Sequence, residues 1–300
     1  MAGVAASWER QNERGALWAM RLLFWIARML GRRVARLVLY PITAYFLLTG
    51  RAARAASRDY LRRALQREPG WRDVARHFFT FAAVSLDRVF WLIGTGQAPR
   101  VTRHRPDEVY RIQRRGGCLI LVAHFGSFEV RHDPSSTQHE VPLRIVLDRA
   151  HGRMFTQLLE QTNPQAAKSV IDASQPGPTL MLAIKQALDG GAMVGLMADR
   201  ARAGERTVTV DFLGGKARLP ATPWILAGVL NVPVVIGFGI YRGGLDYDAH
   251  FELLAERVVL PRAQRDTAIQ AHAQRYADRL AHYVRAAPYN WFNFYDFWAP

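Results

Sequence analysis

The stretch Gly116-Gly-Cys-Leu-Ile-Leu-Val-Ala-His-Phe-Gly-Ser-Phe-Glu129 begins with a glycine pair, continues as an apolar run and ends in chemically active residues. A short apolar run that follows a glycine turn is typical of a buried strand, so we predict a strand over residues 118–123. In α/β proteins the functional groups lie just beyond the ends of such strands. This stretch therefore predicts an α/β domain with a site directly after the strand.

The sequence after residue 100 alternates between strand-like and helix-like segments. This alternation predicts an α/β fold with a central, mostly parallel sheet flanked by helices. We divide the chain into basic helices over 1–56 and a domain over 57–300, with a helical lead-in over 57–95 and an α/β core over 116–300. The other predicted strands are 142–147, 192–197, 208–212 and 232–239, and the predicted helices are 57–67, 71–93, 154–161, 179–188, 222–230 and 263–285.

His124 and Glu129 are separated by four residues, an HX4E motif. If a helix begins just after His124, Glu129 lies about one turn into it, and its carboxylate can turn back to the imidazole. A carboxylate on one ring nitrogen fixes the tautomer, and the other nitrogen can then take a proton from a nucleophile. Gly126 allows close approach to a substrate, and we expect backbone N–H groups near Gly126 and Ser127 to bind an oxyanion. The alternative is a capping histidine with a solvated glutamate.

A second polar group follows the predicted strand 192–197. Asp199 and Arg200 come directly after it, and Lys216 and Arg218 follow in the next segment. Arginine suits the recognition of phosphate or carboxylate, so we expect these cations near an anionic group of a substrate. The alternative for Asp199 and Arg200 is a surface pair at the end of a strand.

Composition limits the class of protein. Half of the 300 residues are hydrophobic, which excludes a disordered chain. The formal net charge of +15 implies an anionic partner: nucleic acid, an anionic membrane or a phosphorylated substrate. The single cysteine, Cys118, fits a small core residue and forms no disulfide within the chain. The histidines and acidic residues crowded over 124–140 do not have the spacing of a zinc site, so we expect no metal.

The segment 16–50 combines apolar residues with a stripe of arginines. On one helix the arginines fall within an arc of about 80°, and Trp18, Trp25 and aliphatic residues cover the rest. This pattern favours a helix that lies in a membrane interface; a packed helix with a solvated face and a true span are the alternatives. Gly31 is a point at which the helix can break. The first stripe consists of Arg10, Arg14, Arg21, Arg28, Arg32 and Arg36, and a second consists of Arg51, Arg54, Arg58 and Arg62.

Together these blocks resemble the lysophospholipid acyltransferase superfamily, in particular its lipid A biosynthesis (lauroyl/myristoyl) branch. The segment 124–129 is similar to that branch's His-Phe-Gly-Asn-Trp-Glu, with Ser127 and Phe128 in place of Asn and Trp. Asp199-Arg200, Phe212-Leu-Gly-Gly-Lys-Ala217 and the aromatic segment Pro288–Trp298 are similar to its later elements, although many relatives have Gln where Arg200 stands. The start Trp8-Glu-Arg-Gln-Asn-Glu-Arg-Gly15 looks closer to predicted acyltransferases of aryl polyene or xanthomonadin-type pigment clusters.

The resemblance implies an enzyme that moves a fatty or polyene acyl group from an acyl-carrier-protein or coenzyme A thioester to a hydroxyl or amine of a lipid-like acceptor. It needs no metal or organic cofactor and no nucleic acid. It implies a place at the cytoplasmic face of the cell inner membrane, peripheral or monotopic. The family's catalytic pair maps onto His124 and Glu129, its later aspartate onto Asp199, and a basic residue between the blocks onto Arg149 or Lys168.

Two alternatives stay open at this point. A basic protein that binds membrane or nucleic acid without catalysis would also carry a charge of +15. The aromatic segment 289–298 would suit an interfacial belt or lid, or equally a strip packed on the core.

Overall fold

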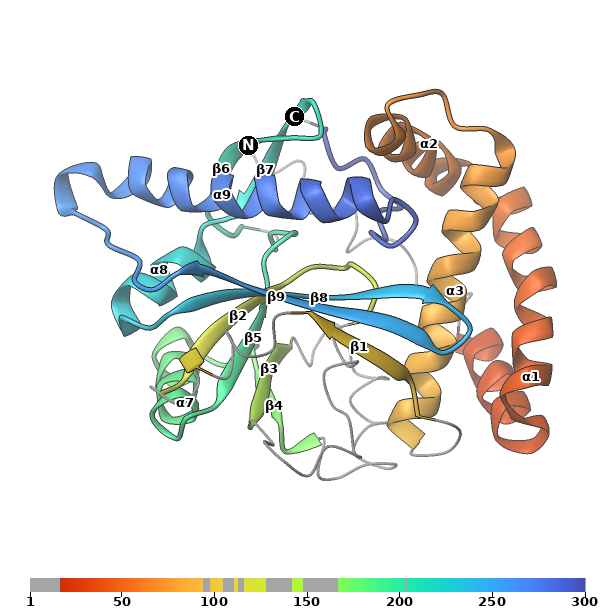
Figure 1. The fold of residues 1–300 in the computed structure, drawn as a ribbon, viewed down its shortest axis with the longest axis horizontal. Coiled ribbons are helices and arrows are strands. Elements are labelled where there is room, and N and C mark those ends of the chain that lie inside the picture. The colour runs from red at the N-terminus through yellow and green to blue at the C-terminus, as the bar shows by residue number, and fades with distance from the viewer. Residues whose placement is uncertain are drawn as a thin grey trace.

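The computed structural model describes residues 17–93, 98–104, 111–112, 116–127, 142–147, 167–202 and 204–299. A sheet forms the centre of these residues (Figure 1). The helix α9 (Arg265–Ala286) lies across one face of the sheet, and three N-terminal helices stand beside one end of it. The predicted α/β class with a mostly parallel central sheet is confirmed.

The central sheet has seven strands in the order β1-β9-β8-β2-β5-β3-β4. Every neighbouring pair is parallel except β8 and β9, which form an antiparallel hairpin. Strand β2 is buried along its whole length, as its uninterrupted apolar sequence requires. The strands are β1 (Arg100–His104), β2 (Cys118–Val122), β3 (Leu143–Leu147), β4 (Val170–Asp172), β5 (Met193–Met197), β8 (Val234–Gly243) and β9 (Asp246–Ala255).

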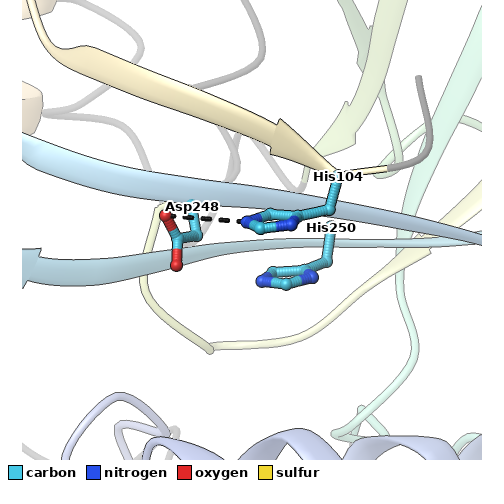
Figure 2. A group of neighbouring side chains, drawn as sticks. All are labelled: His104, Asp248 and His250. Atoms are coloured by element: carbon cyan, nitrogen blue, oxygen red, sulfur yellow. Dashed lines mark ion pairs between the residues drawn. The ribbon is translucent and has the colours of Figure 1, made fainter.

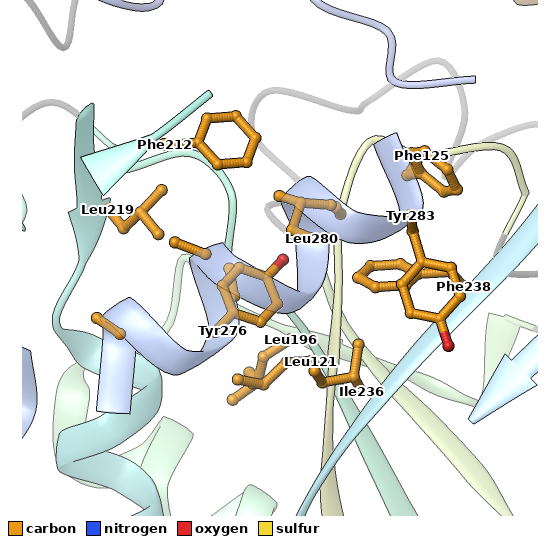
Figure 3. Packing of buried hydrophobic residues seen from close by; sticks show 14 of the residues in the cluster. Leu121, Phe125, Leu196, Phe212, Leu219, Ile236, Phe238, Tyr276, Leu280 and Tyr283 are labelled. Atoms are coloured by element: carbon orange, nitrogen blue, oxygen red, sulfur yellow. The ribbon is translucent and has the colours of Figure 1, made fainter. Parts of the chain in front are cut away.

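The core between the sheet and α9 is built from one face of each. Figure 3 shows Tyr276, Leu280 and Tyr283 of α9 in one packed cluster with sheet residues that include Leu121 and Ile236. Buried positions in α9 recur every three or four residues, so a single stripe of the helix meets the sheet. The other helices of this part are α7 (Gly177–Asp189), α8 (Thr222–Leu230) and the short η3 (Arg262–Gln264).

A separate antiparallel hairpin packs on α9. It consists of β6 (Thr207–Phe212) and β7 (Gly215–Pro220). Leu213 and Gly214 make the turn with φ of 49° and 78°, the left-handed pair that a two-residue hairpin turn requires.

The N-terminal helices are α1 (Leu17–Thr49), α2 (Arg51–Leu65) and α3 (Trp71–Ile93). Gly31, with φ 76° and ψ 175°, interrupts α1 and divides it into two helical parts, as its position in the sequence predicted. The helix α2 begins at Arg51, before the predicted start at residue 57, so the boundary drawn between residues 56 and 57 falls inside a helix.

The structure describes the side chains of two arginines of the first stripe, Arg32 and Arg36. Both face the protein. Arg32 donates a hydrogen bond to Asp87 of α3 at 2.9 Å, and Arg36 donates to the carbonyl of Gly244 at 3.1 Å. These two arginines of the predicted interfacial helix therefore contact the protein itself. The physical reason is a buried acceptor: the Asp87 side chain is 1% exposed, and Arg32 neutralises it.

The opposite face of α1 is apolar and exposed. Leu37, Tyr40, Tyr45 and Leu48 are 60–80% exposed. Among the described residues, no helix combines the length and the apolar character needed to cross a membrane.

Four of the observed strands are not among those predicted from the sequence, namely β1, β4, β7 and β9. The helix predicted over 154–161 lies outside the described residues. The remaining predicted strands and helices are present, with bounds that differ by a few residues.

Candidate active site

Strand pairing brings His124 and Asp199 together. Strands β2 and β5 are parallel neighbours, and Val122 of β2 is paired with Met197 of β5. His124 and Asp199 each follow the paired residue of their own strand by two positions. Both therefore leave the carboxyl edge of the sheet at the same level, where α/β folds place their sites.

Asp199 binds both the backbone and the side chain of His124. The His124 N–H donates to Oδ2 at 3.0 Å, and the ring Nδ1 lies 3.0 Å from Oδ1. Because a carboxylate only accepts hydrogen bonds, Nδ1 carries the proton, and the neutral ring then holds its lone pair on Nε2. The Asp199 side chain is fully buried, whereas the His124 side chain is 36% exposed.

The aromatic segment near the C-terminus completes this arrangement. The indole Nε1 of Trp291 donates to Asp199 Oδ2 at 3.0 Å, and the backbone N–H of Phe292 donates to the His124 carbonyl at 2.8 Å. Trp291 is fully buried. Of the two readings of this segment, the strip packed on the core is the observed one.

The electrostatic surroundings fix the charge of both groups. Burial raises the pKa of Asp199, but the His124 ring, Arg200 and the His124 backbone N–H outweigh it, so the pKa lies well below its usual range. Burial and the charge of Arg200 lower the pKa of His124, and Asp199 opposes them only in part. At neutral pH the pair is thus an aspartate beside a neutral imidazole.

The His124 ring lines a pocket of about 190 Å³. Arg88 of α3 and Arg200 supply positive charge, while the other side chains are mostly apolar or aromatic. The Nε of Arg200 is buried and has no hydrogen-bond partner among the described residues. The remaining lining residues are Phe81, Ala123, Gly126, Met197, Phe292, Phe294 and Tyr295.

The backbone donors at Gly126 and Ser127 are occupied. The Gly126 N–H donates to the Asn290 carbonyl at 2.8 Å, and the Ser127 N–H donates to the Gly239 carbonyl at 2.8 Å. The expectation that these two groups bind an oxyanion is therefore not met. Gly126 serves close packing instead: its φ is +57°, and a Cβ there would lie 1.8 Å from the Gly239 oxygen.

Three of the other predicted binding residues lie away from the pocket. Lys168 is exposed and precedes β4, so it lies at the amino edge of the sheet, opposite to His124. Lys216 pairs with Asp211 at 2.7 Å on the exposed face of the hairpin, where both side chains are 70% exposed, and Arg218 lies on that same face. Glu129 and Arg149 lie outside the described residues, so their predicted roles stay predictions.

The sequence patterns assign no site role to Arg88 or Trp291, although Trp291 lies in the aromatic segment that resembles a family element. Arg88 lies inside a helix, with nothing to set it apart from the other arginines. Trp291 is one of several aromatic residues in a row, and its contact with Asp199 depends on folding across the whole chain.

Comparison of the sequence with models of known protein families identifies the family of this chain. A model of bacterial lipid A biosynthesis acyltransferases matches residues 7–299. The chain belongs to the bacterial lipid A biosynthesis acyltransferase family. No curated protein gives a significant match. As a member of an acyltransferase family the chain is an enzyme, and the reading as a basic binding protein without catalysis is set aside.

Proposed function

We propose that this acyltransferase moves an acyl group from an acyl-carrier-protein or coenzyme A thioester to a hydroxyl or amine of a lipid-like acceptor, with His124 as the general base. The observation that carries the proposal is the His124–Asp199 pair beside the pocket at the carboxyl edge of the sheet. Family membership supplies the reaction class.

The protonation state of His124 suits a base. The lone pair on Nε2 takes the proton of the acceptor as its oxygen or nitrogen attacks the thioester carbonyl, and the imidazolium is then stabilised by Asp199. The thiolate leaves when the tetrahedral intermediate collapses, and it receives the proton from His124. Within this proposal Asp199 makes the orienting contact on Nδ1 that the sequence predicted for Glu129. Glu129 lies outside the described residues, and its role stays a prediction.

The negative charge of the tetrahedral intermediate needs donors other than Gly126 and Ser127. Arg200 fits this role because it lines the pocket beside His124 and carries a fixed positive charge, with its Nε 3.9 Å from Asp199 Oδ2. Tyr295 holds the guanidinium in place, with its ring centroid 5.0 Å from the Arg200 Cζ. Arg88 is the second cation of the pocket and is suited to a phosphate or carboxylate of the acceptor.

The acyl chain and the acceptor would be apolar partners. Phe81, Phe292 and Phe294 make the pocket wall suitable for a hydrocarbon or polyene chain. We propose that neither a metal nor an organic cofactor takes part in the transfer, since acid–base chemistry at His124 suffices.

We also propose that the enzyme works at the cytoplasmic face of the inner membrane, bound at its surface. The exposed apolar face of α1, represented by Leu37 and Leu48, is suited to the acyl region of a bilayer. Arg51 and Arg58 of α2 are exposed and available to lipid phosphates.

The test uses the purified full chain with fatty-acyl and polyenoyl thioesters of acyl carrier protein and of coenzyme A, supplied with lipid acceptors in mixed micelles. Release of the free thiol and formation of acylated lipid are measured together. We expect His124→Ala to lower transfer at least about 1,000-fold, because base catalysis and orientation of the nucleophile are both lost.

His282→Ala is the matched control, since His282 is an exposed histidine on α9. It should retain wild-type transfer. Wild-type turnover by a folded His124→Ala variant would refute the proposed base. Absence of acyl transfer by the wild-type enzyme with every thioester tested would refute the proposed donor class.

A further inference from the structure

Strands β1 and β9 place two histidines and an aspartate on one face of the sheet. His104 of β1 is paired in register with His250 of β9. Asp248 precedes His250 by two residues, so its side chain leaves the same face of β9. Figure 2 shows the two rings one above the other, with Asp248 beside them.

The three side chains converge. One ligand atom from each residue lies within 4.8 Å of those of the other two. His104 Nε2 is 3.8 Å from Asp248 Oδ1, and the two imidazole rings are parallel with centroids 4.2 Å apart.

The ring nitrogens that face this cluster are not satisfied by hydrogen bonds. Nε2 of His104 and Nε2 of His250 are both buried and make no hydrogen bond with any described residue. Leaving a buried polar nitrogen unpaired costs about 1–3 kcal/mol, so two such atoms side by side require an explanation. A shared ligand for both nitrogens would remove this cost.

We propose that His104, Asp248 and His250 bind a divalent transition-metal ion of the zinc type, through two imidazole nitrogens and one carboxylate oxygen, with water as a fourth ligand. This ligand set fits Zn²⁺ and similar ions, whereas Mg²⁺ and Ca²⁺ prefer oxygen ligands alone.

Closing the site requires the two rings to rotate, because stacked parallel imidazoles direct their lone pairs side by side. With metal–ligand bonds of about 2.0–2.1 Å, ligands of a tetrahedral ion lie about 3.4 Å apart. The stacked rings must tilt so that their lone pairs meet at one point. His104 has room to do so, because its side chain is 43% exposed.

The surroundings hold the ligands in place. Arg242 Nε donates to Asp248 Oδ2 at 2.7 Å, which leaves Oδ1 directed to His104. Such contacts to the outer atoms of a ligand orient it, although the positive charge of Arg242 also weakens the attraction for a cation. The Tyr283 ring packs against His250 with centroids 5.1 Å apart.

The expected role of the ion is structural. Strand β1 is at the edge of the sheet and is paired only with β9 among the described strands. A metal ion that joins His104 to His250 would fasten this edge strand to the hairpin β8/β9. The three ligands share no residue with the pocket beside His124.

The test is a calorimetric titration of the full chain, freed of metal with a chelator, with ZnCl₂. Wild type should bind one more equivalent of Zn²⁺ than His104→Gln or His250→Gln, or should bind it more than about 10-fold more tightly than either variant. His282→Gln, which changes an exposed histidine on α9, should titrate as wild type does. Equal stoichiometry and affinity in wild type and both variants would overturn the proposal.

A second measurement keeps the test independent of variant folding. Wild-type protein is treated with diethyl pyrocarbonate with and without Zn²⁺, and the modified histidines are located by peptide mass spectrometry. Zn²⁺ should reduce the labelling of His104 and His250 at least several-fold and leave His282 unchanged. Labelling of His104 and His250 that is indifferent to Zn²⁺ would count against the site.

Discussion

His77 makes the stability of this protein depend on pH. The residue is fully buried in α3, where its Nε2 donates to the carbonyl of Trp291 at 2.9 Å and its Nδ1 accepts from Ser57 at 2.8 Å. Burial lowers the pKa of His77 from 6.5 to about 4, and the hydrogen bond to Trp291 offsets only part of that effect.

The direction in which stability changes with pH follows from the pH at which each state takes up a proton at His77. Below pH 6.5 the unfolded chain binds a proton at His77 that the folded protein does not bind until about pH 4. Stability is therefore fully present above pH 6.5 and is lost as the pH falls toward 4. At pH 5 the loss attributable to this residue is about 2 kcal/mol relative to pH 8.

The perturbation is His77→Gln, because glutamine can still donate to the Trp291 carbonyl and accept from Ser57 but does not titrate. Urea unfolding, followed by tryptophan fluorescence at pH 8, 6 and 5, gives the free energy of unfolding of each protein. Between pH 8 and pH 5 we expect wild type to lose about 2 kcal/mol more than His77→Gln.

His282→Gln controls for the removal of a histidine in general and should follow wild type at each pH. Parallel losses of stability in wild type and His77→Gln would refute the assignment of this pH dependence to His77. A larger loss of unfolding free energy in His77→Gln than in wild type between pH 8 and pH 5 would show a pH dependence of the opposite direction.

Two further predictions concern packing and the membrane. Gly126→Ala should lower the free energy of unfolding by more than about 3 kcal/mol, because the new Cβ meets the carbonyl of Gly239 at a positive φ; Gly177→Ala, with open space around it, should be nearly neutral in the same denaturation assay. Leu48→Ser, at a position 80% exposed on α1, should weaken flotation with anionic vesicles about tenfold, whereas Val259→Ser, 58% exposed elsewhere, should not. Wild-type stability of Gly126→Ala would contradict the first expectation. Equal flotation of Leu48→Ser and Val259→Ser would contradict the second.

The sequence predicts the location of the site better than its internal contacts. Apolar runs mark β2 and β5 as buried strands, and His124 and Asp199 stand directly after them. The sequence does not show that these strands are neighbours, because pairing order is decided by how the whole sheet assembles. The contact of Asp199 with the His124 ring is therefore visible only in the fold.

Strand β9 was missed although its pattern was present. Polar residues alternate with apolar ones along Asp246–Ala255, the period expected of a strand with two different faces. The histidine cluster could not have been predicted even with β9 assigned. His104 is far from His250 in sequence, and only the parallel register of β1 and β9 brings them together.

The helix α1 shows how tertiary contacts alter a pattern read from one helix. A helical wheel separates the arginines from the apolar residues but does not say which side meets the protein. The buried carboxylate of Asp87 attracts Arg32, so the charged side turns inward and apolar side chains such as Leu37 remain outside.

The contacts of Trp291 and Phe292 with Asp199 and His124 also have a consequence for the order of synthesis. The ribosome makes His124 and Asp199 long before residues 291–292, so a nascent chain can assemble the sheet while the pair still lacks its partners. Only a polypeptide translated through this segment can hold the imidazole and carboxylate in the observed arrangement. A prematurely terminated product would keep a basic, apolar N-terminal region but lack the completed pair. With His124 as the proposed base, acyl transfer would then require a chain whose translation has passed this point.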